Sequence, residues 1–146
     1  MIVLDTNALS DGMKPSPSER VLRWLALEEP SSVFVTAITQ AEILAGIEVM
    51  PAGKRRQSLT AAATRMFDEY FHGRILAFDA EAGRQFATIS GIRKAAGRPI
   101  SQFDAMIAAI VRVHRATLAT RNVGDFDHCG IRLVNPWLIN PGTDVH

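Results

Sequence analysis

The chain has 146 residues, 47% of them hydrophobic, which is enough for one domain with a sizeable core. A net charge of +1 argues against binding nucleic acid by overall charge alone, and a single cysteine, Cys129, excludes an intrachain disulfide or a thiolate metal cluster. We expect a cytoplasmic protein, because the sequence opens without a signal-peptide pattern, has no apolar run of membrane-spanning length and suits a reducing compartment.

Apolar, β-branched runs in the first half of the chain predict two strands, at residues 2–4 and 33–35. The stretches between and after them have the spacing of apolar residues that is typical of helices. Ser16 is placed as an N-cap with Pro17 at the first helical position, so we expect one helix to begin there and to stop before Pro30. Further helices are predicted at residues 7–13, 39–49 and 54–72.

The second half continues the alternation, with strands predicted at residues 75–78, 117–120 and 131–134. Asp79 and Ser101 are placed as the N-caps of two helices, and Gly97 as the residue that ends the first of them. Strands that alternate with helices favour a parallel sheet covered on both faces. The predicted fold class is therefore α/β, a three-layer α/β/α sandwich around a central parallel sheet of four to five strands.

Polar residues lie where predicted strands end or helices begin: Asp5, Glu42, Asp104, Asn122 and Asp125. Each has a purely structural interpretation. Asp5 is placed to cap a helix, Asn122 to cap a turn, and Asp125 to be an acid on the surface. Residues 39–42 and 101–104 both match the capping-box pattern, with Thr39 and Ser101 as the caps.

Taken together, these residues favour a shared site. Helices that follow the strands of an open parallel sheet begin along the carboxyl edge of that sheet, where ligands bind. Several carboxylates at one edge repel each other unless a cation neutralises them. Cysteine and histidine are absent from these segments, so the ligands would be oxygen atoms, which suit Mg²⁺ or Mn²⁺. Such a site suits hydrolysis of a phosphodiester.

The sequence resembles PIN-domain proteins of the VapC and FitB type, the toxins of bacterial type II toxin–antitoxin pairs. The resemblance covers residues 1–137, which we take as one domain, with residues 138–146 as a flexible tail. Each matching motif is short, and their order and spacing make the resemblance specific. The motifs are VLDTN at 3–7, ITQAEILAG at 38–46, DAMIAA at 104–109, LATRNVGDF at 118–126 and NPW at 135–137.

The resemblance implies a Mg²⁺-dependent endoribonuclease, with Mn²⁺ able to substitute. Asp5 and Asp104 match the main metal ligands, and Glu42 would complete the acidic pocket. FitB-like members carry aspartate where this chain has Asn122, whereas other members have asparagine there and an acid three residues later, as Asp125 is here. Three neighbouring side chains are placed to hydrogen-bond the carboxylates: Thr6, Asn7 and Thr120. Arg121 is placed either to contact a substrate phosphate or to pair with an acid.

Two functional interpretations follow from the resemblance. In the first, the chain is a homodimeric ribonuclease that a small DNA-binding antitoxin wraps and inhibits by inserting a basic side chain into the acidic pocket. In the second, it is a FitB-like regulatory subunit of an antitoxin–DNA complex, with weak or no nuclease activity, and the asparagine at position 122 favours this alternative. On both interpretations the chain contacts DNA only through the antitoxin.

Overall fold

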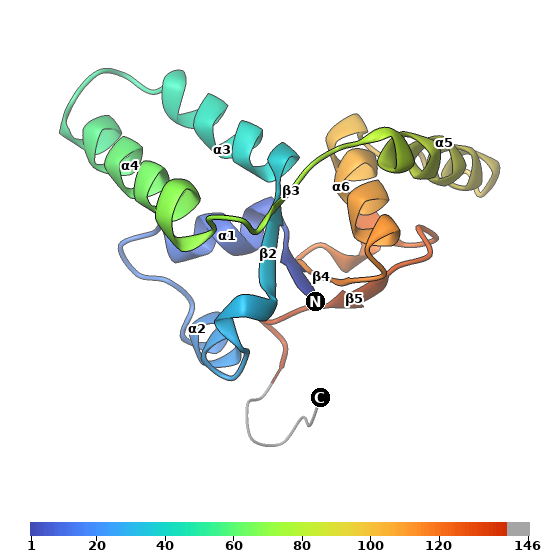
Figure 1. Ribbon diagram of the computed structural model, residues 1–146, viewed down its shortest axis with the longest axis horizontal. Helices are drawn as coiled ribbons and strands as arrows, with labels where there is room; N and C mark the ends of the chain where they lie inside the picture. Colours follow the sequence, from blue (N-terminus) through green and yellow to red (C-terminus); the bar gives the residue numbers. More distant parts are fainter. Residues whose placement is uncertain (140–146) are drawn as a thin grey trace.

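The computed structural model describes residues 1–139, so of the predicted tail only Leu138 and Ile139 are described, and Ile139 packs against the core. A five-stranded sheet in the order β3-β2-β1-β4-β5 forms its centre, with all four pairings parallel (Figure 1). This confirms the predicted α/β architecture. The strands are β1 (Ile2–Leu4), β2 (Val33–Thr36), β3 (Ile75–Leu76), β4 (Thr117–Ala119) and β5 (Arg132–Val134).

Within residues 1–139, six α-helices cover the two faces of the sheet (Figure 1). They are α1 (Thr6–Gly12), α2 (Glu19–Ala26), α3 (Ala37–Glu48), α4 (Lys54–Arg65), α5 (Ala80–Ala95) and α6 (Gln102–Val113). Short 3₁₀ segments lie at Pro30–Ser32 (η1) and Val123–Phe126 (η3), and α4 continues as a π-helical stretch, Met66–Tyr70 (η2). None of the helices within residues 1–139 combines the length and the apolar character needed to cross a bilayer.

Successive residues of a strand pack into two separate hydrophobic cores, one on each face of the sheet, because side chains alternate between the faces. In β1, Val3 packs with α5 and α6, whereas Leu4 packs with the helices of the other face. β4 repeats the pattern with Leu118 and Ala119. Strands buried on both sides read as continuous apolar runs, which is why the sequence predicts them well.

Two helix starts differ from the sequence prediction. Ser18, not Ser16, is the N-cap of α2, and the buried carboxylate of Asp11 accepts a hydrogen bond from the Ser18 backbone N–H at 2.9 Å. The predicted capping box at Thr39 is also wrong. Thr36, the last residue of β2, caps α3, and its hydroxyl accepts the N–H of Thr39 at 3.1 Å. The start of α2 therefore depends on the contact with Asp11, and the start of α3 on the position of Thr36 at the end of β2.

Three predicted element lengths are also corrected. The third strand ends at Leu76 instead of residue 78, and the fourth at Ala119 instead of 120. The predicted helix 54–72 changes to π-helical geometry at Met66, which brings Phe67 and Phe71 into the core. The predicted caps Asp79 and Ser101 are confirmed, and Gly97 has the positive φ of 68° expected after α5.

Candidate functional site

The site lies at the carboxyl ends of β1 and β4, where the strand order reverses. β1 connects outward to β2 on one side, and β4 lies on its other side. Such a switch point leaves a crevice beyond the strand ends. Asp5 follows β1 directly, and its backbone N–H donates to the carbonyl of Ala119 at the end of β4, at 2.9 Å. The first acid of the chain is thus fixed by the sheet itself.

Asp5 is a buried carboxylate, with 4% of its surface exposed. Its Oδ1 accepts the backbone N–H of Thr6 at 2.8 Å, so it also caps α1 as the sequence predicts. Its Oδ2 accepts from the Thr120 hydroxyl at 2.8 Å and from Asn7 Nδ2 at 3.2 Å. Burial raises the pKa of Asp5 to about 6, and the negative charges of Asp104 and Glu42 add to this rise, while the Thr120 and Thr6 hydrogen bonds oppose it.

Thr120 uses all the hydrogen-bonding capacity of its hydroxyl. While donating to Asp5, it accepts the backbone N–H of Asn122 at 3.1 Å and the side-chain amide of Asn7 at 3.4 Å. The carbonyl of Asn7 in turn accepts the backbone N–H of Arg121 at 3.2 Å. Thr120 and Asn7 therefore couple the first acid to the segment that carries Asn122.

Glu42 reaches the same region from the second turn of α3. The Thr6 hydroxyl donates to Glu42 Oε1 at 2.9 Å. The hydroxyl of buried Thr39 lies 3.0 Å from that of Thr6. Because the Thr6 hydroxyl has one proton and directs it to Glu42, Thr39 is the donor of this second bond. A chain of two threonines thus orients the second acid.

Asp104 lies in the first turn of α6, where its backbone N–H donates to the capping hydroxyl of Ser101 at 3.2 Å. The pKa of Asp104 is raised mainly by burial and further by the charge of Asp125, whereas the Ser101 hydrogen bond and the positive charge of Arg93 lower it. Asn122 and Asp125 are exposed and lie at the start and within η3. Asn122 makes no side-chain capping bond to η3, in contrast to its structural interpretation.

The five predicted site residues line one cleft with a volume of about 380 Å³. The residues that line it are Asp5, Thr6, Asn7, Ser10, Glu42, Asp104, Asn122, Asp125 and Phe126. All of its charged side chains are acidic. Within residues 1–139, however, no three His, Cys, Asp or Glu side chains lie close enough together to form a ready-made metal cage. The acids line the same cleft, but their carboxylates are spaced too widely to form a preformed set of metal ligands.

Some residues at the site differ from the sequence expectations. The guanidinium of Arg121 lies 5.4 Å from the ring centre of Trp137 and does not line the cleft. No ion pair joins it to an acid among the described residues. Ser10, Phe126 and the orienting Thr39 were not predicted. Ser10 lies four residues after Thr6 on a helix, so helical spacing was a usable signal for it, whereas the role of Thr39 depends on a tertiary contact.

Comparison with known proteins gives a consistent result. Residues 2–130 match the model of the PIN domain family. Toxin FitB of Neisseria gonorrhoeae is 36% identical over 137 residues, which cover 94% of this chain and 99% of the toxin. A VapC ribonuclease of Sinorhizobium fredii is 38% identical over 140 residues, covering 94% and 98% of the two chains.

A solved structure supports the same assignment. The structure of FitAB bound to a DNA fragment contains a chain that matches this one with a TM-score of 0.87 and 36% identity, over 96% of this chain and 98% of that one. The fold and the resemblance predicted from the motifs are therefore confirmed. The chain belongs to the PIN-domain family, as a protein of the VapC and FitB toxin type.

Proposed function

We propose that this protein is a metal-dependent endoribonuclease, the toxin of a type II toxin–antitoxin pair. The observation that carries the proposal is the acidic cleft, in which Asp5, Glu42 and Asp104 converge from three different elements. The name of the VapC relative, a ribonuclease, supports nuclease chemistry on this family of folds. RNA phosphodiesters would be cleaved by attack of water, leaving a 5′-phosphate and a 3′-hydroxyl. We expect the protein to act in the cytoplasm as a homodimer.

The cleft suits a hard divalent cation. The side-chain atoms that could coordinate a cation there are the oxygen atoms of carboxylates, amides and hydroxyls, and oxygen is the ligand that Mg²⁺ and Mn²⁺ favour. Burial is the main cause of the raised pKa of Asp5, with a smaller contribution from the charges of Asp104 and Glu42, and a bound cation would stabilise the ionised form of this carboxylate. Asp5 and Asp104 would hold the ion, with Glu42 directly or through water. When bound, Mg²⁺ would lower the pKa of water and neutralise charge on the phosphoryl group.

The remaining residues would act on these acids and on the substrate. Thr120, Asn7 and Thr6 hold the carboxylates of Asp5 and Glu42 in fixed orientations through the hydrogen bonds described above. Asn122 and Asp125 would complete the far wall, where Asn122 brings no charge. Arg121 would reach a substrate phosphate by leaving the Trp137 ring.

A second candidate function is a regulatory subunit with weak or no nuclease activity. The absence of a closed metal cage within residues 1–139, together with an uncharged Asn122, favours it. The FitAB structure with a DNA fragment gives a model for such a complex. On this alternative the partner supplies the DNA contacts.

A cleavage assay with the purified protein separates the two candidates. Structured RNA is incubated with the wild type and with Asp5→Asn, prepared identically, in Mn²⁺, in Mg²⁺ and in EDTA. We expect metal-dependent cleavage by the wild type alone. Equal cleavage by both proteins would mean a contaminant or a different site. No cleavage by either would favour the regulatory subunit.

The partner would bind beside the cleft. A groove of about 730 Å³ between α1, α3 and α4 shares Thr6, Ser10 and Glu42 with the cleft, and its floor is largely apolar. The large apolar side chains of the lining are those of Met13, Pro15, Ile43, Ile47, Met50 and Leu59. Such a groove suits an amphipathic segment of an antitoxin. A basic side chain at the end of that segment would enter the acidic cleft, as the resemblance to the family implies.

Two neighbouring residues at the end of α3 test this site. Met50 lines the groove, whereas Val49 is 84% exposed and does not. Co-expression with a candidate antitoxin, followed by a pull-down, should show at least tenfold weaker binding for Met50→Glu than for the wild type. Val49→Glu should bind like the wild type. Equal loss or equal retention in both variants would place the partner elsewhere.

A further inference from the structure

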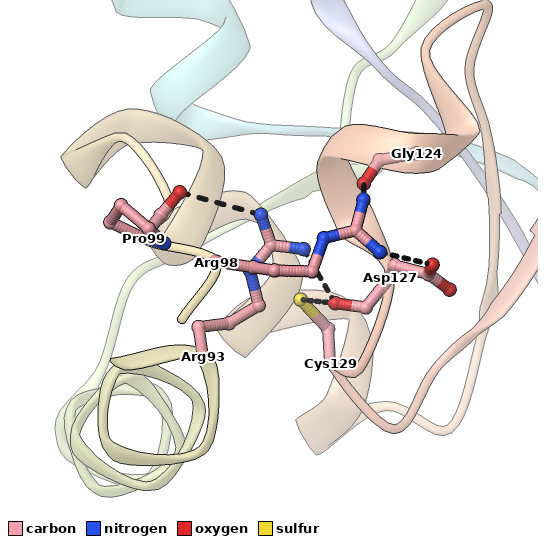
Figure 2. Close-up of polar contacts among 6 residues, drawn as sticks. All are labelled: Arg93, Arg98, Pro99, Gly124, Asp127 and Cys129. Carbon is pink, nitrogen blue, oxygen red and sulfur yellow. Dashed lines mark hydrogen bonds and ion pairs between the residues drawn. The ribbon is translucent and has the colours of Figure 1, made fainter. Parts of the chain in front are cut away.

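Two arginines outside the cleft link the loop before α6, the helix that carries Asp104, to the η3 segment, which carries Asp125. Arg93 lies near the end of α5, and Arg98 lies in the loop that leads to α6 (Figure 2). Both guanidinium groups point toward residues 124–127, the stretch that includes most of η3. Asp104 is carried by the helix after this loop, and Asp125 by η3. The arginines therefore bridge the supports of two cleft acids.

Arg93 is buried, with 4% of its surface exposed, although it carries a permanent charge. Its Nη1 donates to the carbonyl of Asp127 at 2.6 Å and its Nη2 to the carbonyl of Pro99 at 3.5 Å. Among the described residues no carboxylate pairs with it, and its Nε–H has no partner. Burying a cation without a carboxylate is costly. Its two hydrogen bonds go to backbone carbonyls of two different segments.

Arg98 adds a second bridge to the same stretch. Its Nη1 lies 2.9 Å from Asp127 Oδ2, and its Nη2 donates to the carbonyl of Gly124 at 3.4 Å (Figure 2). The thiol of buried Cys129 donates to the Asp127 carbonyl at 3.6 Å. Burial raises the pKa of this thiol, so it stays protonated and able to donate. Asp127 thus accepts hydrogen bonds from three side chains, those of Arg93, Arg98 and Cys129.

The stretch 122–127 is consequently held at both ends. At its start, the N–H of Asn122 bonds to Thr120, which also holds Asp5. At its end, Asp127 bonds to the two arginines. Pro99, the other partner of Arg93, lies two residues before Ser101, whose hydroxyl fixes the N–H of Asp104. A displacement at Arg93 would change the spacing between Asp104 and Asp125.

We propose that Arg93 and Arg98 are positioning residues that set the spacing between Asp104 and the Asn122–Asp125 wall. Neither arginine lines the cleft. They act through the carbonyl and the carboxylate of Asp127, through the carbonyl of Gly124 and through the loop before α6. The proposal rests on the proposed metal-binding function of the cleft for its effect on affinity. Its effect on local rigidity does not depend on a metal.

Four variants separate bridging from charge. Arg93→Met removes both bridges with little change in length. Arg93→Lys keeps the charge, but one ammonium group replaces the planar fork that reaches both carbonyls. Arg98→Ala removes the more exposed bridge alone. Arg84→Met is the matched control, since Arg84 lies on the same helix and pairs with Glu81 on the surface.

Two measurements on the full chain test the proposal. Amide hydrogen exchange reports on Asp125 and Asp127, whose N–H groups donate to the carbonyls of Asn122 and Gly124. Titration calorimetry reports the affinity for Mn²⁺. We expect Arg93→Met to raise the exchange rates of these amides at least tenfold, with the exchange rates of β4 amides unchanged. We also expect it to weaken Mn²⁺ binding about tenfold. Arg98→Ala should give about threefold effects, and Arg84→Met none.

Wild-type exchange and affinity in Arg93→Met would overturn the proposal, as would full recovery of Mn²⁺ affinity in Arg93→Lys, because charge alone would then suffice. If Arg93→Met does not fold, unchanged values in Arg98→Ala serve the same purpose. Absence of Mn²⁺ binding by the wild type would contradict the proposed function instead. The exchange rates would then decide on the arginine bridges by themselves.

Discussion

At the scale of single residues, the ionised and buried side chain of Asp5 lowers the free energy of unfolding. A carboxylate that is 4% exposed and faces two other acids is less stable as an anion than in water. Its hydrogen bonds from Thr120, Asn7 and Thr6 offset part of this cost. On the proposed function, a bound cation would offset the rest of this cost.

Asp5→Asn should therefore stabilise the metal-free protein, and increasingly so as the pH rises. The folded pKa of about 6 lies above the ordinary value of 3.8, so the native state binds more protons than the unfolded state between these values. Asp5 thus lowers the free energy of unfolding as the pH rises through this window. Since one pKa unit is worth about 1.4 kcal/mol, the difference between variant and wild type should grow by about 2.5 kcal/mol from pH 4 to pH 7.5.

Urea unfolding in EDTA at several pH values measures this difference. Comparing the variant with the wild type removes the contributions of other titrating groups, since these are shared. A constant difference across the pH range would contradict the raised pKa. Asp104→Asn should show a change of the same sign, because its pKa is also raised.

Thr120→Val should weaken metal binding without removing an acid. Valine has the shape of threonine but cannot donate to Asp5 or accept from Asn122, so both lose their fixed positions. Loss of such a supporting contact typically costs 10- to 100-fold in metal affinity, and we expect about tenfold for Mn²⁺ by calorimetry. Thr120→Ser keeps the hydroxyl and should stay near the wild type. Equal affinities in Thr120→Val and the wild type would show that the hydroxyl does not orient Asp5.

At the scale of elements, the sequence predicts which segments are helices better than where they start. Strands buried on both faces give unmistakable apolar runs, and the motifs around Asp5 and Asp104 place both acids at helix starts. The caps of α2 and α3 could not be predicted in this way, because two serines or two threonines offer the same local chemistry. The choice of Ser18 depends on Asp11, and that of Thr36 on the end of β2.

The two serines before α2 provide a direct test of the cap. Ser18→Ala removes the bond from Val21 N–H to the Ser18 hydroxyl, which is long at 3.4 Å, so we expect a loss of about 0.5–1 kcal/mol in the free energy of unfolding. Ser16→Ala, in the same exposed loop, should change it by less than about 0.5 kcal/mol. Thermal or urea unfolding of both variants measures this. A larger loss for Ser16→Ala would restore the assignment made from the sequence.

At the scale of the whole molecule, two hydrophobic cores meet at one crevice. One core carries α3 with Glu42, and the other carries α6 with Asp104, while β1 between them ends in Asp5. The order of the strands makes this convergence predictable, since switch points collect residues from both sides of a sheet. The open spacing of the acids could not be predicted, because it depends on how the helices and η3 are held, down to the Arg93 and Arg98 bridges.

A bound cation should stabilise this arrangement in a pH-dependent way. At pH 7.5 Asp5 is ionised, and Mn²⁺ at a hundredfold excess over its dissociation constant should add about 2.7 kcal/mol to the free energy of unfolding. At pH 5, below the pKa of about 6, protons compete for Asp5, so the same Mn²⁺ concentration should add much less. Melting temperatures in Mn²⁺ and in EDTA at both pH values measure the effect, with Asp5→Asn as the control that should lose it. An equal shift in melting temperature at both pH values would mean that Mn²⁺ binds away from Asp5. A site whose ligands do not titrate near pH 6 would bind Mn²⁺ equally well at pH 5 and at pH 7.5.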